Sequence, residues 1–375
     1  MRTPRTPRAA VPLAASRWVA AAVSRVIQRR PPGTSLELLP SPHPSLASTN
    51  DLIEAISRHR VIPLLTPWVE QLGLPPACVV KLEALRRQQH ILGLANMVAT
   101  AKVAKALSEA KVDHLVVKGV CLPALGQRQP AARGSGDVDL WVRASDLGAA
   151  ELALARAGWR RGDQHQALPR EGDGWRWRIL VRFSYEITLS HPKHSDVDLH
   201  WRLGHVAREF SFSFEQALTQ SVALPAVGES VRTLAPLQAL EHLAQHGRKE
   251  AWPTLRHLVD IIELAQWCGR QQVRDLALQQ ANLRLALACA AHLSPGLIDG
   301  VPMDRRSIML AAEAWTGCLS LTKVHADRLS LEGVAAVRSR ISMAWWLMRS
   351  APTRPVMLNH FLWLVGPIGA VVRRR

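Results

Sequence analysis

The stretch Arg133-Gly-Ser-Gly-Asp-Val-Asp-Leu-Trp-Val142 is the most informative part of this chain. Its alternating second half predicts a β-strand that begins at Asp137 and ends at Val142. On a strand, Asp137 and Asp139 point to the same face, about 7 Å apart along the backbone. The glycines before them leave room for a ligand close to the main chain. Such a pair is suited to a divalent metal that bridges phosphate oxygens, although a bare Asp-x-Asp is also common on solvated strands.

Two upstream segments carry side chains that a metal–phosphate site requires. Lys118-Gly119 follows a short β-branched strand predicted over residues 112–117. A tight turn there presents backbone N–H groups and a cation to phosphate, although Lys-Gly is also an ordinary solvated turn. Arg133 and Ser135 stand directly before the two acids and are able to donate hydrogen bonds to phosphate oxygens. We therefore predict that Lys118, Gly119, Arg133 and Ser135 bind the nucleotide.

A downstream strand supplies a third acid. The alternation in Asp196-Val-Asp-Leu-His-Trp201 places Asp196, Asp198 and His200 on one face and apolar side chains on the other. Two-metal nucleotidyl transfer needs a third carboxylate on a neighbouring strand, and this acid can help to deprotonate the attacking hydroxyl. Asp198 is the expected third acid, and His200 is expected to orient it or to contact the substrate. A hairpin with one wet face is the alternative interpretation.

The histidines and tryptophans suggest further substrate contacts. His242 and His246 have the i, i+4 spacing used for zinc, but no third ligand is recognisable, so we expect His246 to line a substrate pocket together with Lys249. The run Trp175-Arg-Trp-Arg178 alternates aromatic and basic side chains. We expect it to lie on a strand or loop, where it could line an acceptor groove.

The period of the apolar residues changes along the chain and divides it into five regions. The predicted regions are a basic, disordered leader over residues 1–44, in which 13–28 could form a short amphipathic helix; an N-terminal helical region over 45–110; a mixed core over 111–205; a C-terminal helical region over 230–350; and an apolar, basic tail over 351–375.

Individual elements follow from the same patterns. Thr49 or Asn50 is expected to cap the first helix of the N-terminal region. The further predicted helices cover residues 77–110, 122–127, 145–157, 236–247, 253–268, 271–292, 304–321 and 332–348, and an antiparallel pair of strands covers 179–189 and 195–202. A small mixed sheet with helices packed on it defines the fold class as α+β.

The amino-acid composition indicates which partners the protein binds and in which cellular compartment it occurs. The formal net charge is +17, mostly from arginine, and favours polyanionic partners such as nucleotides, nucleic acid or anionic lipid. Five cysteines without a Cys-x-x-Cys pair predict reduced, buried thiols and a cytoplasmic protein. The arginine-rich composition suggests a bacterial source.

Arg17 interrupts the only apolar stretch near the N-terminus, which argues against a signal peptide. Residues 357–372 are too short and too broken to span a membrane, so the termini are expected at most to touch one peripherally.

The motifs together resemble a known family. Lys118-Gly119, Leu122 and Arg133-Gly-Ser-Gly-Asp-Val-Asp-Leu140 are similar to the uncharacterised bacterial nucleotidyltransferase family, within the polymerase-β-like superfamily. The resemblance continues at His59-Arg-Val-Ile-Pro-Leu-Leu65 and at Val197-Asp-Leu-His-Trp201. Its C-terminal helical motif is similar to His246-Gly-Arg-Lys249 with Trp252, Leu255 and Asp260. It spans roughly residues 50–270, with four separated motifs in the family's order. Glu250 stands where a second histidine is common in the family, and His257 where a tryptophan is common.

The resemblance implies a fold and an activity. The implied fold is a polymerase-β-like nucleotidyltransferase core flanked by N-terminal and C-terminal helical regions. The implied activity is transfer of a nucleoside monophosphate from an NTP, with ATP the expected donor, to an unidentified hydroxyl or phosphate acceptor. Asp137, Asp139 and Asp198 would be catalytic and would bind Mg²⁺ or Mn²⁺, with Lys118-Gly119 near the triphosphate. A small-molecule, sugar or peptide acceptor in polysaccharide or peptide natural-product biosynthesis is the expectation.

Two alternatives stay open at the level of sequence. The first is a nucleic-acid-modifying enzyme, such as a tRNA-directed toxin-type nucleotidyltransferase, which the positive charge favours. The second is a non-catalytic nucleotide-binding protein on the same fold. It is kept because the superfamily's usual Gly-Ser after the first strand is replaced by Lys118-Gly119. Three clustered acids argue against it, because a fold without catalysis has no need to gather like charges.

Overall fold

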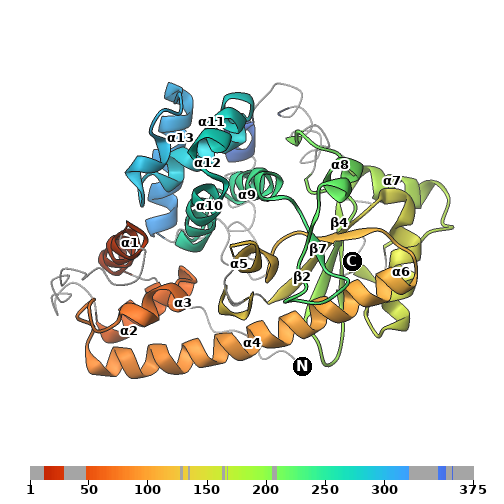
Figure 1. Ribbon diagram of the computed structural model, residues 1–375, viewed down its shortest axis with the longest axis horizontal. Coiled ribbons are helices and arrows are strands. Elements are labelled where there is room, and N and C mark those ends of the chain that lie inside the picture. The colour runs from red at the N-terminus through yellow and green to blue at the C-terminus, as the bar shows by residue number, and fades with distance from the viewer. Residues whose placement is uncertain are drawn as a thin grey trace.

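The computed structural model contains a seven-stranded mixed sheet (Figure 1). The structure describes residues 12–28, 48–126, 130–133, 136–162, 165–166, 168–204, 209–320, 345–351 and 357. The strand order is β3-β4-β5-β2-β1-β7-β6. The strands are β1 (His114–Val116), β2 (Asp137–Val142), β3 (Arg160–Arg161), β4 (Glu186–Ser190), β5 (Asp196–His200), β6 (Val222–Ala223) and β7 (Arg232–Thr233). The α+β class is thereby confirmed.

One face of the sheet is apolar and covered by helices. Val138, Leu140 and Val142 of β2 alternate with the acids and point into a buried cluster with Val197 and Leu199 of β5. Two helices contribute to this cluster, the second half of α4 (Pro76–Glu109) and α6 (Leu147–Arg156). Because this face is fully packed, the register of β2 is fixed and its acids are directed to the opposite face.

Helices of the C-terminal region form a second core beside the polar face of the sheet (Figure 1). Trp141 of β2 joins this second core, with ring contacts to Phe212 and Phe214. The helices are α9 (Pro236–Glu250), α10 (Leu255–Cys268), α11 (Arg270–Gln279), α12 (Ala281–Ala290) and α13 (Arg305–Ser320), and residues 345–350 are also helical.

The amphipathic helix expected within the leader is present as α1 (Leu13–Gln28). Its buried side includes Val19, Val23 and Val26, and it packs against α13 and the N-terminal helices. Ser24 Oγ donates a hydrogen bond to the carbonyl oxygen of Leu293 at 2.7 Å. The disorder expected over residues 1–44 therefore does not extend to this helix, because its apolar side is buried. The rest of the leader lies outside the described residues.

The N-terminal helical region contains α2 (Thr49–Arg58), α3 (Ile62–Leu65) and α4, which confirms the long helix expected over 77–110. The expected cap at Thr49 or Asn50 was wrong. Ser48 caps α2, accepting a hydrogen bond from the backbone N–H of Asp51, whose carboxylate accepts one from the Ser48 N–H.

Two other local predictions were wrong. A strand was expected over 179–189, and the run Trp175–Arg178 was expected on a strand or loop, but helix α7 (Trp175–Phe183) contains this run and the start of the expected strand. Leu180 is buried in the sheet-side core, and this packing outweighs the β-propensity of the segment. The helix expected over 271–292 is broken at Gln280, whose backbone is extended. The short strands β3, β6 and β7 carry too few residues to show a period. The helix expected over 332–348 lies outside the described residues for most of its length.

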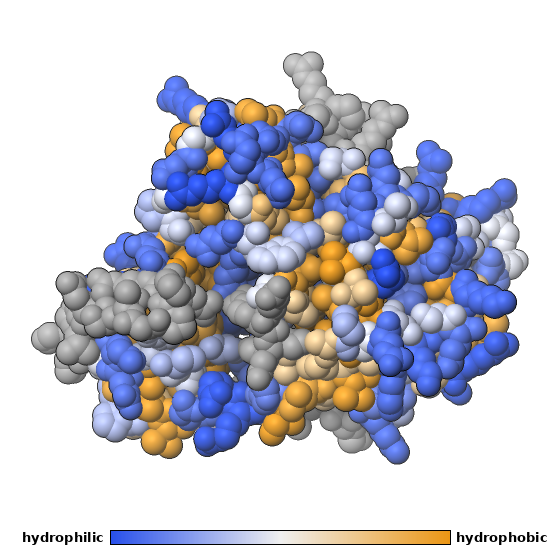
Figure 2. Space-filling model, in the orientation of Figure 1, coloured by the Kyte–Doolittle hydropathy of each residue, from blue (hydrophilic) through white to orange (hydrophobic). Residues whose placement is uncertain are grey.

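The surface mixes charged and apolar side chains. Apolar side chains interrupt the hydrophilic surface along the lower edge of Figure 2, where α4 runs. Its exposed apolar residues include Ile91, Leu92 and Val98. Among the described helices, α4 alone is long and apolar enough to cross a membrane, and core helices of soluble proteins meet the same criterion.

Candidate active site

The acids are brought together by parallel pairing of β2 with β5. The register aligns Asp137 with Asp196 and Asp139 with Asp198. Because side chains aligned in a parallel pair share a face, all four carboxylates lie on the polar face of the sheet. Asp139 is buried and Asp137 is exposed, so the row of acids runs from the interior to the surface.

Asp139 is held by an ammonium group and an imidazole. The ammonium of Lys118 lies 2.8 Å from Oδ1 of Asp139, and Nε2 of His200 lies 3.1 Å from the same oxygen. Burial alone would favour the neutral acid, but Lys118 and His200 outweigh it and hold the pKa of Asp139 well below its usual value. Asp139 in turn outweighs the effect of burial on Lys118, whose pKa is raised. Both groups therefore stay charged. The sequence predicted that His200 orients Asp198 or contacts the substrate; in the structure its imidazole bonds Asp139 and not Asp198.

Asp198 has the opposite character. Burial, together with the charges of Asp139 and Glu186, raises its pKa to about 6. The hydroxyl of Thr188 on β4 donates a hydrogen bond to Oδ1 of Asp198 at 2.7 Å and fixes the carboxylate. A carboxylate with a pKa near neutrality is suited to accept a proton from a hydroxyl group.

Asp137 lies at the outer end of the row. Although Asp137 is accessible to solvent, the surrounding protein partly desolvates its carboxylate; this desolvation and the charge of Asp139 raise its pKa, and Lys118 and Arg60 act against this rise. The amide of Asn96 on α4 donates a hydrogen bond to the backbone carbonyl of Asp137 at 2.9 Å and anchors the start of β2. Arg60 is an exposed residue with a positive φ of 57°, in the turn between α2 and α3. It adds a cation that sequence reasoning did not single out.

Arg133 is engaged in a bidentate ion pair. Its guanidinium donates to the carboxylate of Asp260 on α10, with distances of 2.5 Å from Nη2 and 3.1 Å from Nε. Nη1 donates to the carbonyl oxygen of Gly119 at 3.3 Å. Gly119 itself has a φ of 60°, which favours glycine. Arg133 therefore ties the turn after β1 to the C-terminal helices. The predicted Ser135 lies outside the described residues.

Lys249 is connected to the acids through the ring of Tyr185, which contacts both Lys249 and His200. Its ammonium lies 2.8 Å from the hydroxyl oxygen of Tyr185 and 4.5 Å from the ring centroid. The Tyr185 ring stacks on His200 at 6.2 Å, and Nδ1 of His200 lies 3.2 Å from Glu186. Lys249, Tyr185, His200 and Asp139 thus form one connected line from α9 to β2. Tyr185, Glu186 and Thr188 were missed at the level of sequence, and the pairing of β4 with β5 is the signal that identifies them.

His246, the third expected pocket residue, lies on α9 with Lys249 but faces Glu250, with Nε2 3.6 Å from its carboxylate. His242 is buried and packs against the ring of Phe210. Within the described residues, His246 therefore shares a potential metal-binding cluster with Glu250 and His257 rather than with His242.

The donor set on the sheet fits a small, hard divalent cation. Asp137, Asp139 and Asp198 offer carboxylate oxygens, the ligands that Mg²⁺ and Mn²⁺ prefer. Asp139 is held in its ionised form, so it is ready to bind a cation. The nearby cations Lys118 and Arg60 suit a site that also receives phosphate.

Comparisons with known proteins agree with this geometry. A family model described as an uncharacterised nucleotidyltransferase matches residues 46–298, about two thirds of the chain. The matched region begins just before α2 and ends before α13, so it contains the sheet, the acids and the α9–α10 pair. No curated protein and no solved structure gives a significant match to this sequence.

Proposed function

Because the chain belongs to the uncharacterised nucleotidyltransferase family, we propose that it transfers a nucleoside monophosphate from an NTP to a hydroxyl or phosphate acceptor with the help of Mg²⁺. The observation that carries this proposal is the alignment of Asp139 with Asp198, beside the ammonium of Lys118. Opposite environments drive the pKa values of the two acids apart, which assigns them different roles.

The roles follow from these environments. Asp139 stays ionised and serves as the permanent metal ligand, positioned by His200 and Lys118. Asp198 accepts the proton of a hydroxyl acceptor. The acceptor oxygen attacks the α-phosphorus, the bond from this phosphorus to the oxygen bridging it to the β-phosphate breaks, and pyrophosphate leaves. Lys118 and Arg60 hold the negative charge of the triphosphate.

The implied metal would be held by Asp137, Asp139 and Asp198. When bound, it neutralises charge on the phosphate oxygens and makes the acceptor hydroxyl easier to deprotonate. The chain's own contribution is to keep these carboxylates in register and to fix Asp198 through Thr188. We propose ATP as the first donor to test, and a sugar, peptide or other small molecule of the cytoplasm as the acceptor class.

The experiment is an NTP-turnover assay with matched carboxamide variants. Full-length protein is incubated with each α-labelled NTP, Mg²⁺ or Mn²⁺ and a panel of acceptors, and both pyrophosphate and labelled product are measured. We expect Asp139→Asn and Asp198→Asn to lower the rate by about 10²-fold or more. Asp196→Asn is the control, because Asp196 lies on the same strand and face as Asp198.

Equal rates in wild type, Asp139→Asn and Asp198→Asn would overturn the proposal. A loss of the same size in Asp196→Asn would show that charge on the strand, rather than the alignment of Asp139 with Asp198, carries the activity. Far-UV circular dichroism of each variant establishes that the fold is retained.

The net charge of +17 favours a second candidate acceptor, an RNA end. An RNA acceptor would bind with an affinity that falls steeply with salt concentration. Filter binding of tRNA between low and physiological salt measures this slope. A flat or absent response removes the RNA candidate and leaves the small-molecule acceptor.

A further inference from the structure

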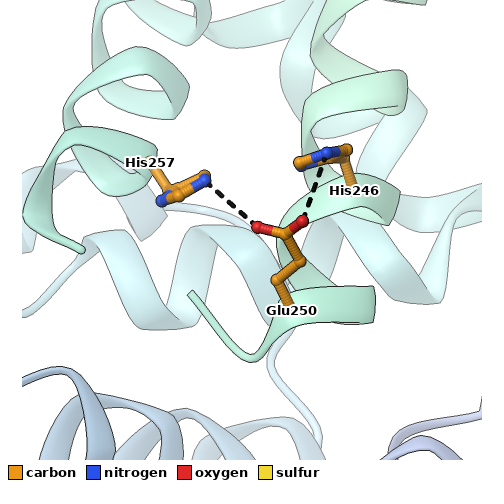
Figure 3. A group of neighbouring side chains, drawn as sticks. All are labelled: His246, Glu250 and His257. Atoms are coloured by element: carbon orange, nitrogen blue, oxygen red, sulfur yellow. Dashed lines mark ion pairs between the residues drawn. The ribbon is translucent and has the colours of Figure 1, made fainter. Parts of the chain in front are cut away.

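A second cluster of ligand-type side chains lies on the C-terminal helices. Nε2 of His246 is 3.6 Å from Oε1 of Glu250, and Nε2 of His257 is 3.6 Å from Oε2 (Figure 3). One ligand atom from each of the three residues can be chosen so that all lie within 4.8 Å of one another. All three side chains are half-buried, and the two imidazoles lie nearly parallel, with an interplanar angle of 18°.

The connection between α9 and α10 creates this cluster. His246 and Glu250 share one face of α9 because they are four residues apart. After α9, Ala251 and Trp252 have positive φ values of 56° and 45°, so the chain reverses tightly. The Trp252 ring packs so closely over Gly247 that a Cβ there would overlap the indole. This reversal brings the first turn of α10, and with it His257, back against Glu250.

The orientation of His257 is fixed from outside the cluster. Its Nδ1 lies 2.9 Å from the hydroxyl oxygen of Thr254. When Nδ1 carries the proton and donates it to this oxygen, Nε2 is left with its lone pair toward Glu250. A hydrogen bond on the far ring nitrogen is the usual partner of a metal-binding histidine.

We propose that His246, Glu250 and His257 bind one transition-metal ion of the Zn²⁺ type through two imidazole nitrogens and one carboxylate oxygen. Tetrahedral Zn²⁺ holds such ligands at about 2.0–2.2 Å, which places neighbouring donor atoms about 3.4 Å apart. The observed separations of 3.6 Å join each imidazole to a different oxygen of Glu250. With a single oxygen of Glu250 as the ligand, the three donor atoms lie within 4.8 Å of one another, so small side-chain rotations bring them to this spacing around an ion. Three protein ligands leave one coordination position for water or another exogenous ligand.

The cluster is chemically distinct from the acids on the sheet. Imidazole nitrogens favour Zn²⁺ and related ions, whereas an all-carboxylate site favours Mg²⁺. The inference therefore goes beyond the nucleotidyl transfer proposed above and does not depend on it. Cations lie near both imidazoles: Lys118 and Lys249 act on His246, and Arg60 and Arg256 act on His257. The ammonium of Lys249 is turned toward Tyr185. Glu250 supplies the negative charge that a bound cation requires.

The test is Co²⁺ substitution of the full chain. Protein stripped by a chelator is titrated with Co²⁺ in excess Mg²⁺, and the visible absorption of the ion is followed, because it reports on coordination geometry independently of activity. We expect one equivalent of a tetrahedral-type band, displaced by Zn²⁺. The band should be lost in His257→Gln and in Glu250→Gln, and Thr254→Val should weaken binding about 10- to 100-fold.

Two controls separate this site from other metal binding. His292→Gln removes an exposed histidine that stacks on Trp315, away from the cluster, and should retain the band. Asp139→Asn should also retain it while losing nucleotidyl transfer. Thermal unfolding without metal shows whether each variant folds. The variant Glu250→Gln keeps nearly the same shape in case His257→Gln does not fold.

The outcomes are decisive in either direction. An absent band in wild type, or equal affinity in wild type, His257→Gln and Glu250→Gln, overturns the proposal. Loss of the band in Asp139→Asn would assign the ion to the acidic site and would also overturn it. Retention of the band in an inactive Asp139→Asn protein supports the proposal whatever the acceptor proves to be.

Discussion

At the scale of single residues, Asp139 is the carboxylate on which the electrostatics of the site converge. One of its oxygens meets both the ammonium of Lys118 and the imidazole of His200. Asp198, its neighbour in register, meets a hydroxyl instead. Two aspartates on adjacent strands thus acquire opposite protonation behaviour, because only Asp139 has partners that outweigh the effect of burial.

The raised pKa of Asp198 predicts how metal binding depends on pH. Below about pH 6 Asp198 binds a proton, which competes with a cation, so the apparent affinity for Mn²⁺ should fall by up to tenfold per pH unit. Electron paramagnetic resonance of free Mn²⁺ measures this slope. A slope just as steep in Asp198→Asn would contradict the assignment.

The same group contributes to stability with a defined sign. The folded-state pKa of Asp198 lies above that of an ordinary aspartate, so its contribution is fully present below the unfolded pKa near 3.9 and is lost as pH rises through about 6. Replacement by asparagine should therefore raise the free energy of unfolding of the metal-free protein at pH 8 more than at pH 4. Denaturant titrations at both pH values measure the difference.

Arg60 predicts a selective effect on nucleotide binding. Arg60 lies in a turn held at positive φ, and its charge lowers the pKa of Asp137. A triphosphate bound beside Asp137 would therefore also be close to the Arg60 guanidinium. Arg60→Ala should raise the KM for NTP several-fold with little change in kcat. The matched control is Arg58→Ala, because Arg58 is paired with Glu54 on α2. An equal rise in KM in both variants would assign the effect to general charge.

At this scale the sequence predicted the shared face of the acids but not the side chains that contact them. The strand period predicted the shared face of Asp137 and Asp139, and the register confirms it. The contact of Arg133 with Asp260 joins residues 127 positions apart, and no local pattern reports such a contact. The same limit applies to His257, which meets Glu250 only because the chain reverses at Ala251 and Trp252.

At the scale of elements, the crossing of α4 over the segment before β2 depends on Gly93. A Cβ at this position would overlap the carbonyl oxygen of Ala131. Gly→Ala in an exposed helix interior normally stabilises by about 0.5–1 kcal/mol. Here Gly93→Ala should destabilise the protein and displace residues 130–133, which carry Arg133.

Thermal unfolding checks the sign of this effect. Leu94→Ala is the control, because Leu94 is exposed on the same helix and should change stability by less than about 0.5 kcal/mol. A higher Tm in Gly93→Ala would show that the segment accommodates the methyl group.

The elements themselves were predictable where one period dominates. Helix α4 and strands β2 and β5 are long or strictly alternating, and the structure confirms them. Helix α7 was mistaken for a strand because tertiary burial of Leu180 decides its conformation. The break at Gln280 between α11 and α12 has no glycine or proline to announce it.

At the scale of the whole molecule, the ion pair between Arg133 and Asp260 joins the core to the C-terminal helices. Their side chains are only 17% and 8% exposed. Asp260→Asn leaves the guanidinium without its charge partner, so we expect a loss of about 3 kcal/mol in the free energy of unfolding. Denaturant unfolding followed by tryptophan fluorescence measures this loss.

A more exposed ion pair provides the comparison. Arg143 pairs with Asp113, whose side chain is 53% exposed, so Asp113→Asn should cost less than about 1 kcal/mol. If both variants lose a similar free energy of unfolding, the pair between Arg133 and Asp260 contributes little to the association of the core with the C-terminal helices.

The contacts of His59 predict which fragments of this protein can be expressed in soluble form. This histidine is buried at the end of α2, where its carbonyl oxygen accepts from the Arg256 N–H at 3.2 Å and its Nδ1 lies 3.4 Å from the Leu255 nitrogen. The first turn of α10 is therefore completed by a residue almost two hundred positions earlier. An expression fragment that starts at β1 would present bare amide groups at that helix end. Splitting the coding sequence there should give insoluble product, whereas co-expressing both pieces should restore a soluble complex.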